Sequence, residues 1–221
     1  LLSLLKIKKT YSLSSTQVYN YLNYGIVSSP NTLFKDFYKV CPAEIIQISF
    51  KGGKPHSTKS IYWKPEEYLG DKSFDKDQFF DILTESIDIR ASADVKVANF
   101  LSGGIDSTAI TKNLYDKGTG VNSFSVYFDN AKYDESKYIN EVTNKYNLNH
   151  KSILISADIK DSDIFQALES LDEPYSDHSV LPSFVLSREI SKHYKVAISG
   201  DGGDELLGGY VRTADSLKYK S

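Results

Sequence analysis

Apolar and polar positions follow two alternating patterns over most of the chain. Stretches with apolar residues three and four apart, as in amphipathic helices, alternate with short apolar runs typical of buried strands. Because strands that alternate with helices form a parallel sheet covered on both faces, the sequence predicts a doubly wound α/β domain. The predicted helices span 74–90, 106–118, 134–148, 163–171 and 181–194, and the predicted strands span 95–101, 121–128, 150–156 and 195–200.

The first 64 residues lack this alternation. A helix is predicted there, with Ser14 or Ser15 as its N-cap and Gly25 at its end. Two strand-like runs follow, at 43–50 and 60–63, with a turn at 51–56 between them. We interpret residues 1–64 as the last part of a separate domain. The boundary is expected in the charged stretch 64–75, so that the α/β domain covers residues 75–221.

Composition and charge exclude several classes of function. The chain has 221 residues, 40% of them hydrophobic, and a net charge of -3 without a basic stripe, so we expect no nucleic acid partner. No apolar run is long enough to cross a bilayer, and the opening residues do not form a secretory signal. We therefore expect a cytoplasmic protein without membrane contact. The single cysteine, Cys41, rules out an internal disulfide framework.

The sequence contains no methionine, not even at position 1. The chain also opens within a pattern rather than at the start of one. We therefore expect it to be part of a longer protein, with the α/β domain incomplete at its C-terminal end.

One loop carries the first candidate chemistry. "SGGIDS", residues 102–107, joins the predicted strand 95–101 to the next helix. Glycines allow a sharp turn and a close approach of the backbone, and a helix N-terminus presents unpaired N–H groups with a positive dipole end. These features predict an anion cradle. Asp106 would repel a bare phosphate, which suggests that Mg²⁺ accompanies the anion.

A plainer interpretation of the same loop is an ordinary strand-to-helix turn, with Asp106 as a helix N-terminal carboxylate. From the glycine and serine pattern alone, the two interpretations are about equally supported. The loop lacks the spacing and the lysine of a Walker A motif, and it lacks the G-x-G-x-x-G dinucleotide fingerprint.

Two motifs together resemble a known family. Residues 102–107 match the S-G-G-x-D-S pyrophosphate loop of the ATP pyrophosphatase superfamily. "SGDGGDELLGGY", residues 199–210, resembles the S-G-[DE]-G-x-D-E-x-x-G-G-Y signature of the asparagine synthase family, and the segments between the motifs resemble it in order and spacing. The resemblance extends over residues 1 to about 213, where the first 64 look like the end of the family's Ntn-type glutaminase domain.

The resemblance implies an adenine nucleotide alpha hydrolase-like fold and a carbon–nitrogen ligase. In such a ligase a carboxylic acid, with aspartate as the leading acceptor, is activated by ATP as an acyl-adenylate, and ammonia from glutamine then displaces AMP. ATP and Mg²⁺ are the implied cofactors, and the partners are small molecules; a homodimer is left open.

Site residues follow from the loop chemistry and from the positions that match the family. Pyrophosphate would be held by Ser102, Gly103, Gly104, Asp106, Ser107 and Thr108. The adenosine would be flanked by Leu101, Ser125, Val126 and Gly200, although Leu101 and Val126 can also be plain core residues. Asp106 and Asp204 are the expected Mg²⁺ ligands. Glu205, Tyr210 and Asp201 match positions near the reacting acyl centre, and Glu205 can alternatively be a helix N-terminal charge.

Several alternatives stay open. Residues 175–178, "YSDH", replace the Thr-Thr-x-Arg stretch with which some relatives bind aspartate, so the acceptor could be another acid, such as a sugar acid or a peptide carboxylate. His178 could contact the acceptor or be an exposed loop residue. Cys41 is interpreted as a structural thiol and not as the glutaminase nucleophile, and the family's catalytic lysine would lie beyond the chain. A cyclase like β-lactam synthetase and a degenerate nucleotide-binding regulatory module are the remaining functions.

Overall fold

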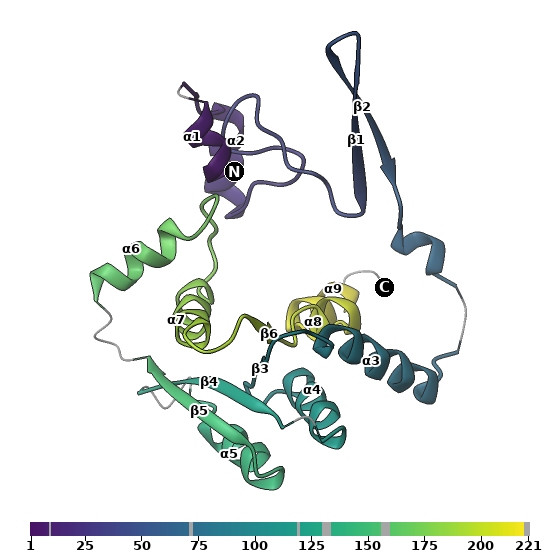
Figure 1. Ribbon diagram of the computed structural model, residues 1–221, viewed down its shortest axis with the longest axis vertical. Coiled ribbons are helices and arrows are strands. Elements are labelled where there is room, and N and C mark those ends of the chain that lie inside the picture. Colours follow the sequence, from purple (N-terminus) through teal and green to yellow (C-terminus); the bar gives the residue numbers. More distant parts are fainter. Residues whose placement is uncertain (9, 71–72, 119, 130–133, 156–159, 219–221) are drawn as a thin grey trace. The chain divides into compact units, whose positions relative to one another are not determined.

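The computed structural model describes residues 1–8, 10–70, 73–118, 120–129, 134–155 and 160–218. The chain divides into two compact units (Figure 1). The first comprises Leu1–Ser73 and Phe165–His178, and the second comprises Phe74–Ile164 and Ser179–Ser221. The division after Ser73 falls inside the stretch where the sequence predicts a boundary. Residues 165–178, however, group with the first unit, whereas the sequence analysis places them in the α/β domain.

The second unit is built on a parallel sheet of four strands in the order β5-β4-β3-β6. The strands are β3 (Val97–Phe100), β4 (Asn122–Phe128), β5 (Asn149–Ile155) and β6 (Val196–Ile198). The chain proceeds outward from β3 to β4 and β5, then returns to place β6 on the other side of β3. This reversal creates a switch point between β3 and β6, and the predicted doubly wound parallel sheet is confirmed.

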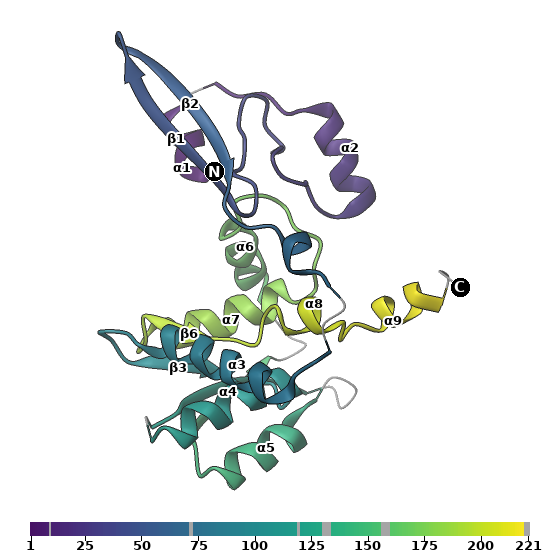
Figure 2. The same cartoon turned by 90° about the vertical axis from the view of Figure 1, so that its right-hand side faces the viewer.

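Helices cover both faces of this sheet. α7 packs on one face, and α4 and α5 lie on the other (Figure 2). The second unit contains α3 (Lys76–Ala91), α4 (Ile105–Asp116), α5 (Ser136–Lys145), α7 (Val180–Ser191), α8 (Gly203–Leu207) and α9 (Val211–Lys218), while α6 (Asp161–Glu169) spans the division between the units. Burial of the inward side chains in two apolar clusters stabilises the layers.

Each cluster belongs to one face. On the α7 face, Ala98 and Phe124 of the sheet pack with Leu186 and Ile190 of α7. On the opposite face, the buried residues are Ile87, Ile110, Leu114, Val121 and Ile198. These clusters hold the strands in register, so that the loops after β3 and β6 leave the sheet side by side.

A polar contact is buried beneath the loop that follows β3. The Asn99 side-chain amide donates to Thr111 Oγ1 of α4 at 2.6 Å, and the Thr111 hydroxyl donates to the Ser107 carbonyl at 2.7 Å. Asn99 and Thr111 are 1% and 0% exposed. The strand is thereby tied to the first turns of α4, and the contact fixes where that helix begins.

The first unit contains helices and a hairpin. Its elements are α1 (Leu2–Ile7), α2 (Ser15–Tyr24), β1 (Glu44–Lys51), β2 (Lys54–Ile61) and the 3-10 helix η1 (Pro65–Tyr68). The prediction for α2 is confirmed: Ser14 is the N-cap and accepts from Gln17 N–H, and Gly25 ends the helix in the left-handed conformation. Within this unit, Glu173 accepts from Lys39 Nζ and from the Leu33 backbone N–H, each at 2.7 Å.

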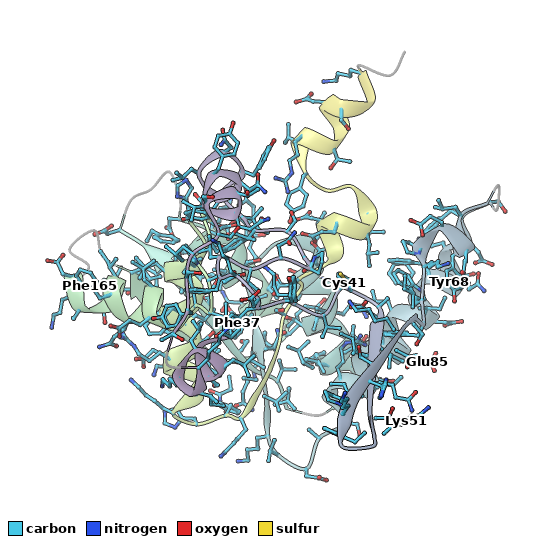
Figure 3. The ribbon with its side chains drawn as sticks, turned by 90° about the horizontal axis from the view of Figure 1, so that it is seen from above. Phe37, Cys41, Lys51, Tyr68, Glu85 and Phe165 are labelled. Carbon is cyan, nitrogen blue, oxygen red and sulfur yellow. The ribbon has the colours of Figure 1, made fainter. Side chains whose placement is uncertain are left out.

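The hairpin differs from its prediction. The sequence predicts a turn over 51–56 and a strand over 60–63, but β2 already begins at Lys54, and the turn is reduced to Gly52 and Gly53. Both glycines have positive φ, at 56° and 76°, a conformation that glycine adopts without a Cβ clash and that suits a two-residue hairpin turn. Lys51 is at the end of β1, directly before this turn (Figure 3).

Replacing Thr111 with valine tests the buried contact. Thr111→Val keeps the side-chain volume but removes the acceptor of the Asn99 amide, and a buried donor left without a partner costs about 1–3 kcal/mol. Chemical denaturation of the full-length protein, followed by circular dichroism, measures the loss in free energy of unfolding. The matched control is Thr143→Val, because the Thr143 hydroxyl bonds Asn140 at an exposed place on α5. An equal change in both variants would contradict the assignment.

Candidate functional site

A cavity lies where β3 and β6 end. Its volume is about 290 Å³. It is lined by residues from the β3–α4 and β6–α8 connections and the helix starts that follow them, from the middle of β4, and from Glu135 and α7. Ligands of open α/β sheets bind beyond the carboxyl ends of the strands, at the switch point of the strand order. The cavity therefore occupies the position that the topology favours for a ligand.

Serine hydroxyls fix the shape of the loop after β3. Ser107 Oγ accepts from the Ser102 backbone N–H at 3.2 Å and donates to the Gly104 carbonyl at 3.2 Å, and it is 3.1 Å from Ser102 Oγ. The first bond of α4 runs from Thr108 N–H to the Gly104 carbonyl. The backbone N–H groups of residues 105–107 precede that bond, so the helix offers them no carbonyl. They are available to an anion at this end of α4.

Gly103 allows the loop to pack against α5. Its φ is 78°, and an added Cβ would lie 2.8 Å from Tyr138 Cβ and 3.0 Å from Ile139 N. A side chain at this position would therefore be strained and would also clash with backbone. Gly103 is not among the cavity-lining residues, so its contribution here is the close contact with α5.

The loop after β6 approaches Asp106 through two further glycines. A Cβ added to Gly203 would lie 2.7 Å from Asp106 Cγ, and one added to Gly200 would lie 3.0 Å from Asp106 Cβ. Only glycine permits this approach without displacement of the carboxylate. Because Gly203 directly precedes Asp204, the two motifs bring Asp106 and Asp204 to the same cavity.

The cavity is rich in negative charge. Four carboxylates line it, from Asp106, Glu135, Asp201 and Asp204, and none of its described lining residues is Lys, Arg or His. Burial raises the pKa of Glu135, and the Ser199 hydroxyl donates to Asp201 Oδ2 at 2.9 Å. Repulsion from these carboxylates disfavours a polyphosphate that carries no compensating cation.

The carboxylates fit the requirements of Mg²⁺. Among the described residues there is no group of three or more His, Cys, Asp or Glu side chains placed to hold a metal ion by themselves. Mg²⁺ is usually bound by one or two carboxylates, with waters and substrate phosphates as its other ligands. Asp106 and Asp204, which both line the cavity, match such a smaller set in number and kind, and a nucleotide would provide the remaining ligands.

Glu205 and Tyr210 form a pair beside the cavity. The Tyr210 hydroxyl donates to Glu205 Oε1 at 2.6 Å, and the Arg212 guanidinium lies 4.5 Å from the centre of the Tyr210 ring. The hydrogen bond from Tyr210 lowers the pKa of Glu205, and the same bond raises the pKa of Tyr210 to about 12. Glu205 is thus held as a carboxylate and Tyr210 as a neutral phenol.

The structure brings most of the predicted site residues to one cavity. The predicted residues that line it are Leu101, Ser102, Gly104, Asp106, Ser107, Ser125, Val126, Gly200, Asp201 and Asp204. The others, Gly103, Thr108, Glu205 and Tyr210, are not among its lining residues. Thr108 Oγ1 is buried without a hydrogen-bond partner in the described part of the chain.

The sequence analysis missed four residues that line the cavity: Phe100, Glu135, Leu186 and Ser199. Ser199 and Phe100 adjoin predicted residues, so the strand ends alone could have indicated them. Glu135 directly precedes α5, which begins at Ser136. Because strands and helices alternate in this part of the sequence, a carboxylate in the connection after β4 could have been predicted to lie near the cavity. Residues 130–133, which belong to a segment that carries the resemblance, lie outside the described residues.

Two other candidates belong to the first unit. Cys41 is half-buried in the segment between α2 and β1, and its backbone N–H donates to Glu44 Oε2 at 3.0 Å (Figure 3). His178 is exposed. Neither residue has a described contact that assigns it a chemical role.

Comparisons with known proteins agree with the resemblance that the two motifs of the site indicate. The asparagine synthase family model matches residues 78–220. The chain is 28% identical to a putative glutamine-hydrolysing asparagine synthetase 2 of Methanocaldococcus jannaschii, over 96% of this chain and 41% of that protein. It is also 28% identical to asparagine synthetase 1 of Bacillus subtilis, over 99% of this chain and 34% of that protein. The chain therefore spans less than half the length of either relative.

A solved structure was also matched. It is an NH3-dependent NAD synthetase from Campylobacter jejuni, with 18% identity and a TM-score of 0.43, over 62% of this chain and 61% of that one. The family is established by the sequence match, which covers more than half of the residues and both loops at the switch point. This chain belongs to the asparagine synthase family.

Proposed function

We propose that this chain forms the ATP-using site of a glutamine-dependent ligase that converts a carboxylic acid, most simply aspartate, into its amide. The observation that supports the proposal most directly is the meeting of the 102–107 and 199–210 motifs at the switch point, where Asp106 and Asp204 line one cavity. The motifs, the family and the acidic cavity support the same chemistry.

In this proposal the chain binds ATP along the loop after β3. The N–H groups at the start of α4 and the Ser102 hydroxyl bind the departing pyrophosphate. Leu101, Val126 and Gly200 flank the adenosine, where the lining is more apolar. Asp106 and Asp204 would hold Mg²⁺, which supplies charge neutralisation on the phosphates. Positioning and electrostatic stabilisation provide the rate enhancement.

The reaction has two steps. A carboxylate oxygen of the acceptor attacks the α-phosphorus of ATP, the bond to the β-phosphate oxygen breaks, and pyrophosphate leaves. Ammonia then attacks the acyl carbon, the bond to AMP breaks with its electron pair on AMP, and the nitrogen loses a proton. Glu205 is the proposed proton acceptor, because the hydrogen bond from Tyr210 keeps it ionised.

The acceptor and the ammonia source are the finer parts of the proposal. Aspartate and glutamine are the substrates that the relatives' names suggest, and residues 1–64 would be the end of a glutaminase domain in the longer protein. A sugar acid or peptide carboxylate as acceptor, and a cyclase in which an internal amine attacks the adenylate, remain the enzymatic alternatives. A cytoplasmic location is part of the same proposal. Separately, none of the described helices is long and apolar enough to cross a membrane.

The nucleotide product tests the chemistry. The full-length protein is incubated with Mg²⁺, ATP, ammonium and a panel of acids led by aspartate, and the products are separated by chromatography. We expect AMP and pyrophosphate in equal amounts, dependent on one acid, together with the amide of that acid. Formation of ADP would contradict adenylation. Absence of acid-dependent turnover would favour the regulatory module.

Neutralising either metal-binding carboxylate should abolish turnover. Asp106→Asn and Asp204→Asn each remove one charge that binds Mg²⁺, and we expect a loss of about 100-fold or more in the rate of AMP formation. Activity should rise again in part with increasing Mg²⁺ concentration. Asp81→Asn, at an exposed position on α3, is the matched control and should leave the rate unchanged. Full activity in either site variant would remove that residue from the metal site.

Tyr210→Phe tests the proposed proton acceptor through the pH profile. The hydrogen bond from Tyr210 lowers the pKa of Glu205, so its removal should raise that pKa toward the ordinary value of 4.5. Glu205 would then lose its charge at a higher pH. The acid limb of kcat/KM, measured at a constant concentration of unprotonated ammonia, should shift upward in pH. Tyr115→Phe is the control and should not shift the acid limb of kcat/KM. If the acid limb does not shift in Tyr210→Phe, the proposed role of Glu205 as proton acceptor is contradicted.

A further inference from the structure

A row of polar side chains runs across one face of the sheet, from buried positions on β3 and β4 to the edge strand β5, where His150 is half-buried and Ser152 is exposed. Asn99, Ser123 and His150 are in register on β3, β4 and β5, and Ser125 is in register with Ser152 two residues further along. Side chains in register on neighbouring strands share a face of the sheet. Ser123 and Ser125 are 0% and 1% exposed, although such positions in a parallel sheet usually carry apolar residues.

His150 connects the members of this row. Its Nδ1 is 2.8 Å from Ser123 Oγ, and its Nε2 is 3.0 Å from both Ser125 Oγ and Ser152 Oγ. Both ring nitrogens are therefore occupied by serine hydroxyls. Burial lowers the pKa of His150, which favours the neutral ring, with one nitrogen as donor and the other as acceptor. A neutral ring in this network sets the direction in which each neighbouring hydroxyl donates.

Ser125 is the member of the group that reaches the cavity. It lines the cavity together with Val126 and Leu101, whereas Ser123, His150 and Ser152 are not among the lining residues. An Nε2–H group that donates to Ser125 Oγ leaves the Ser125 hydroxyl hydrogen free to point elsewhere. Nδ1 then accepts from the Ser123 hydroxyl. Ser152 Oγ lies 3.0 Å from Nε2 and 3.3 Å from Ser125 Oγ, and its hydroxyl can donate to the Ser125 oxygen, which leaves the Ser125 hydrogen available.

We propose that His150 is a positioning residue for the nucleotide: through its Nε2–H it orients the Ser125 hydroxyl to donate a hydrogen bond to an acceptor atom of the nucleoside. The inference rests on the proposed function, since it requires that a nucleoside occupies the cavity between Ser125 and Gly200. In this proposal, His150 contributes to recognition of the nucleoside through Ser125, without touching the nucleoside itself. The phosphate loop and the carboxylates are unaffected by this network.

The test is a double-mutant cycle on ATP binding. The dissociation constant of Mg²⁺-ATP is measured by calorimetry on the full-length protein, with KM and kcat measured in parallel. Ser125→Ala and His150→Leu should each raise the dissociation constant about fivefold, the usual effect of one hydrogen bond, with kcat nearly unchanged. Because the residues act through one bond, the double variant should lose no more than either single variant.

Two further variants separate positioning from folding. His150→Gln retains a side-chain N–H donor and should restore binding in part, which a purely structural loss would not do. His193→Leu, at an exposed histidine after α7, is the matched control and should not change binding. Ser125→Ala keeps the test decisive even if His150→Leu unfolds, because the smaller residue leaves the network's histidine in place.

The outcomes distinguish the two proposals. If the wild-type protein binds ATP and forms AMP, but Ser125→Ala leaves the dissociation constant unchanged, the positioning role is overturned and the proposed function stands. Additive losses in the double variant would likewise overturn it. If the wild-type protein does not bind ATP at all, the proposed function fails, and the inference fails with it.

Discussion

The approach of the loop after β6 to Asp106 is the constraint on which the site depends. A Cβ at Gly203 would displace the Asp106 carboxylate, one at Gly200 would press against Asp106 Cβ, and one at Gly103 would clash with α5. The missing side chains allow two segments far apart in the sequence to approach each other at one edge of the sheet. The strand order provides the opening between β3 and β6, and the glycines let the two loops close around it.

Hydrogen-bonded polar groups inside the second unit stabilise the strands and the helix start that carry these loops. Asn99 and Thr111 tie β3 to the start of α4, and the serines around His150 occupy the same face of the sheet further along. Burial of polar groups costs free energy unless they are hydrogen-bonded, so their presence in the core has to be explained. Each set is linked to the cavity lining, since the Thr111 hydroxyl donates to the Ser107 carbonyl and Ser125 itself lines the cavity.

Much of the second unit could be predicted from the sequence, because helix-like and strand-like periodicities alternate cleanly there and the glycine-rich motifs follow strands. The hairpin was less well predicted, since the two-residue turn at Gly52 and Gly53 depends on positive φ angles that periodicity does not show. The grouping of residues 165–178 with the first unit depends on tertiary contacts such as those of Glu173 with Lys39. The burial of the Thr108 hydroxyl likewise follows from the rotation of α4, which the motif alone does not specify.

The four carboxylates of the cavity have a consequence for how the site distinguishes between forms of its ligand. A nucleotide that carries no metal brings its full negative charge to Asp106, Glu135, Asp201 and Asp204, with no described cationic side chain in the lining to offset it. A nucleotide already complexed with a divalent cation does not meet the same repulsion. Occupancy would therefore follow the metal-bound fraction of the nucleotide pool, and a fall in free divalent cation would empty the site even at constant total nucleotide.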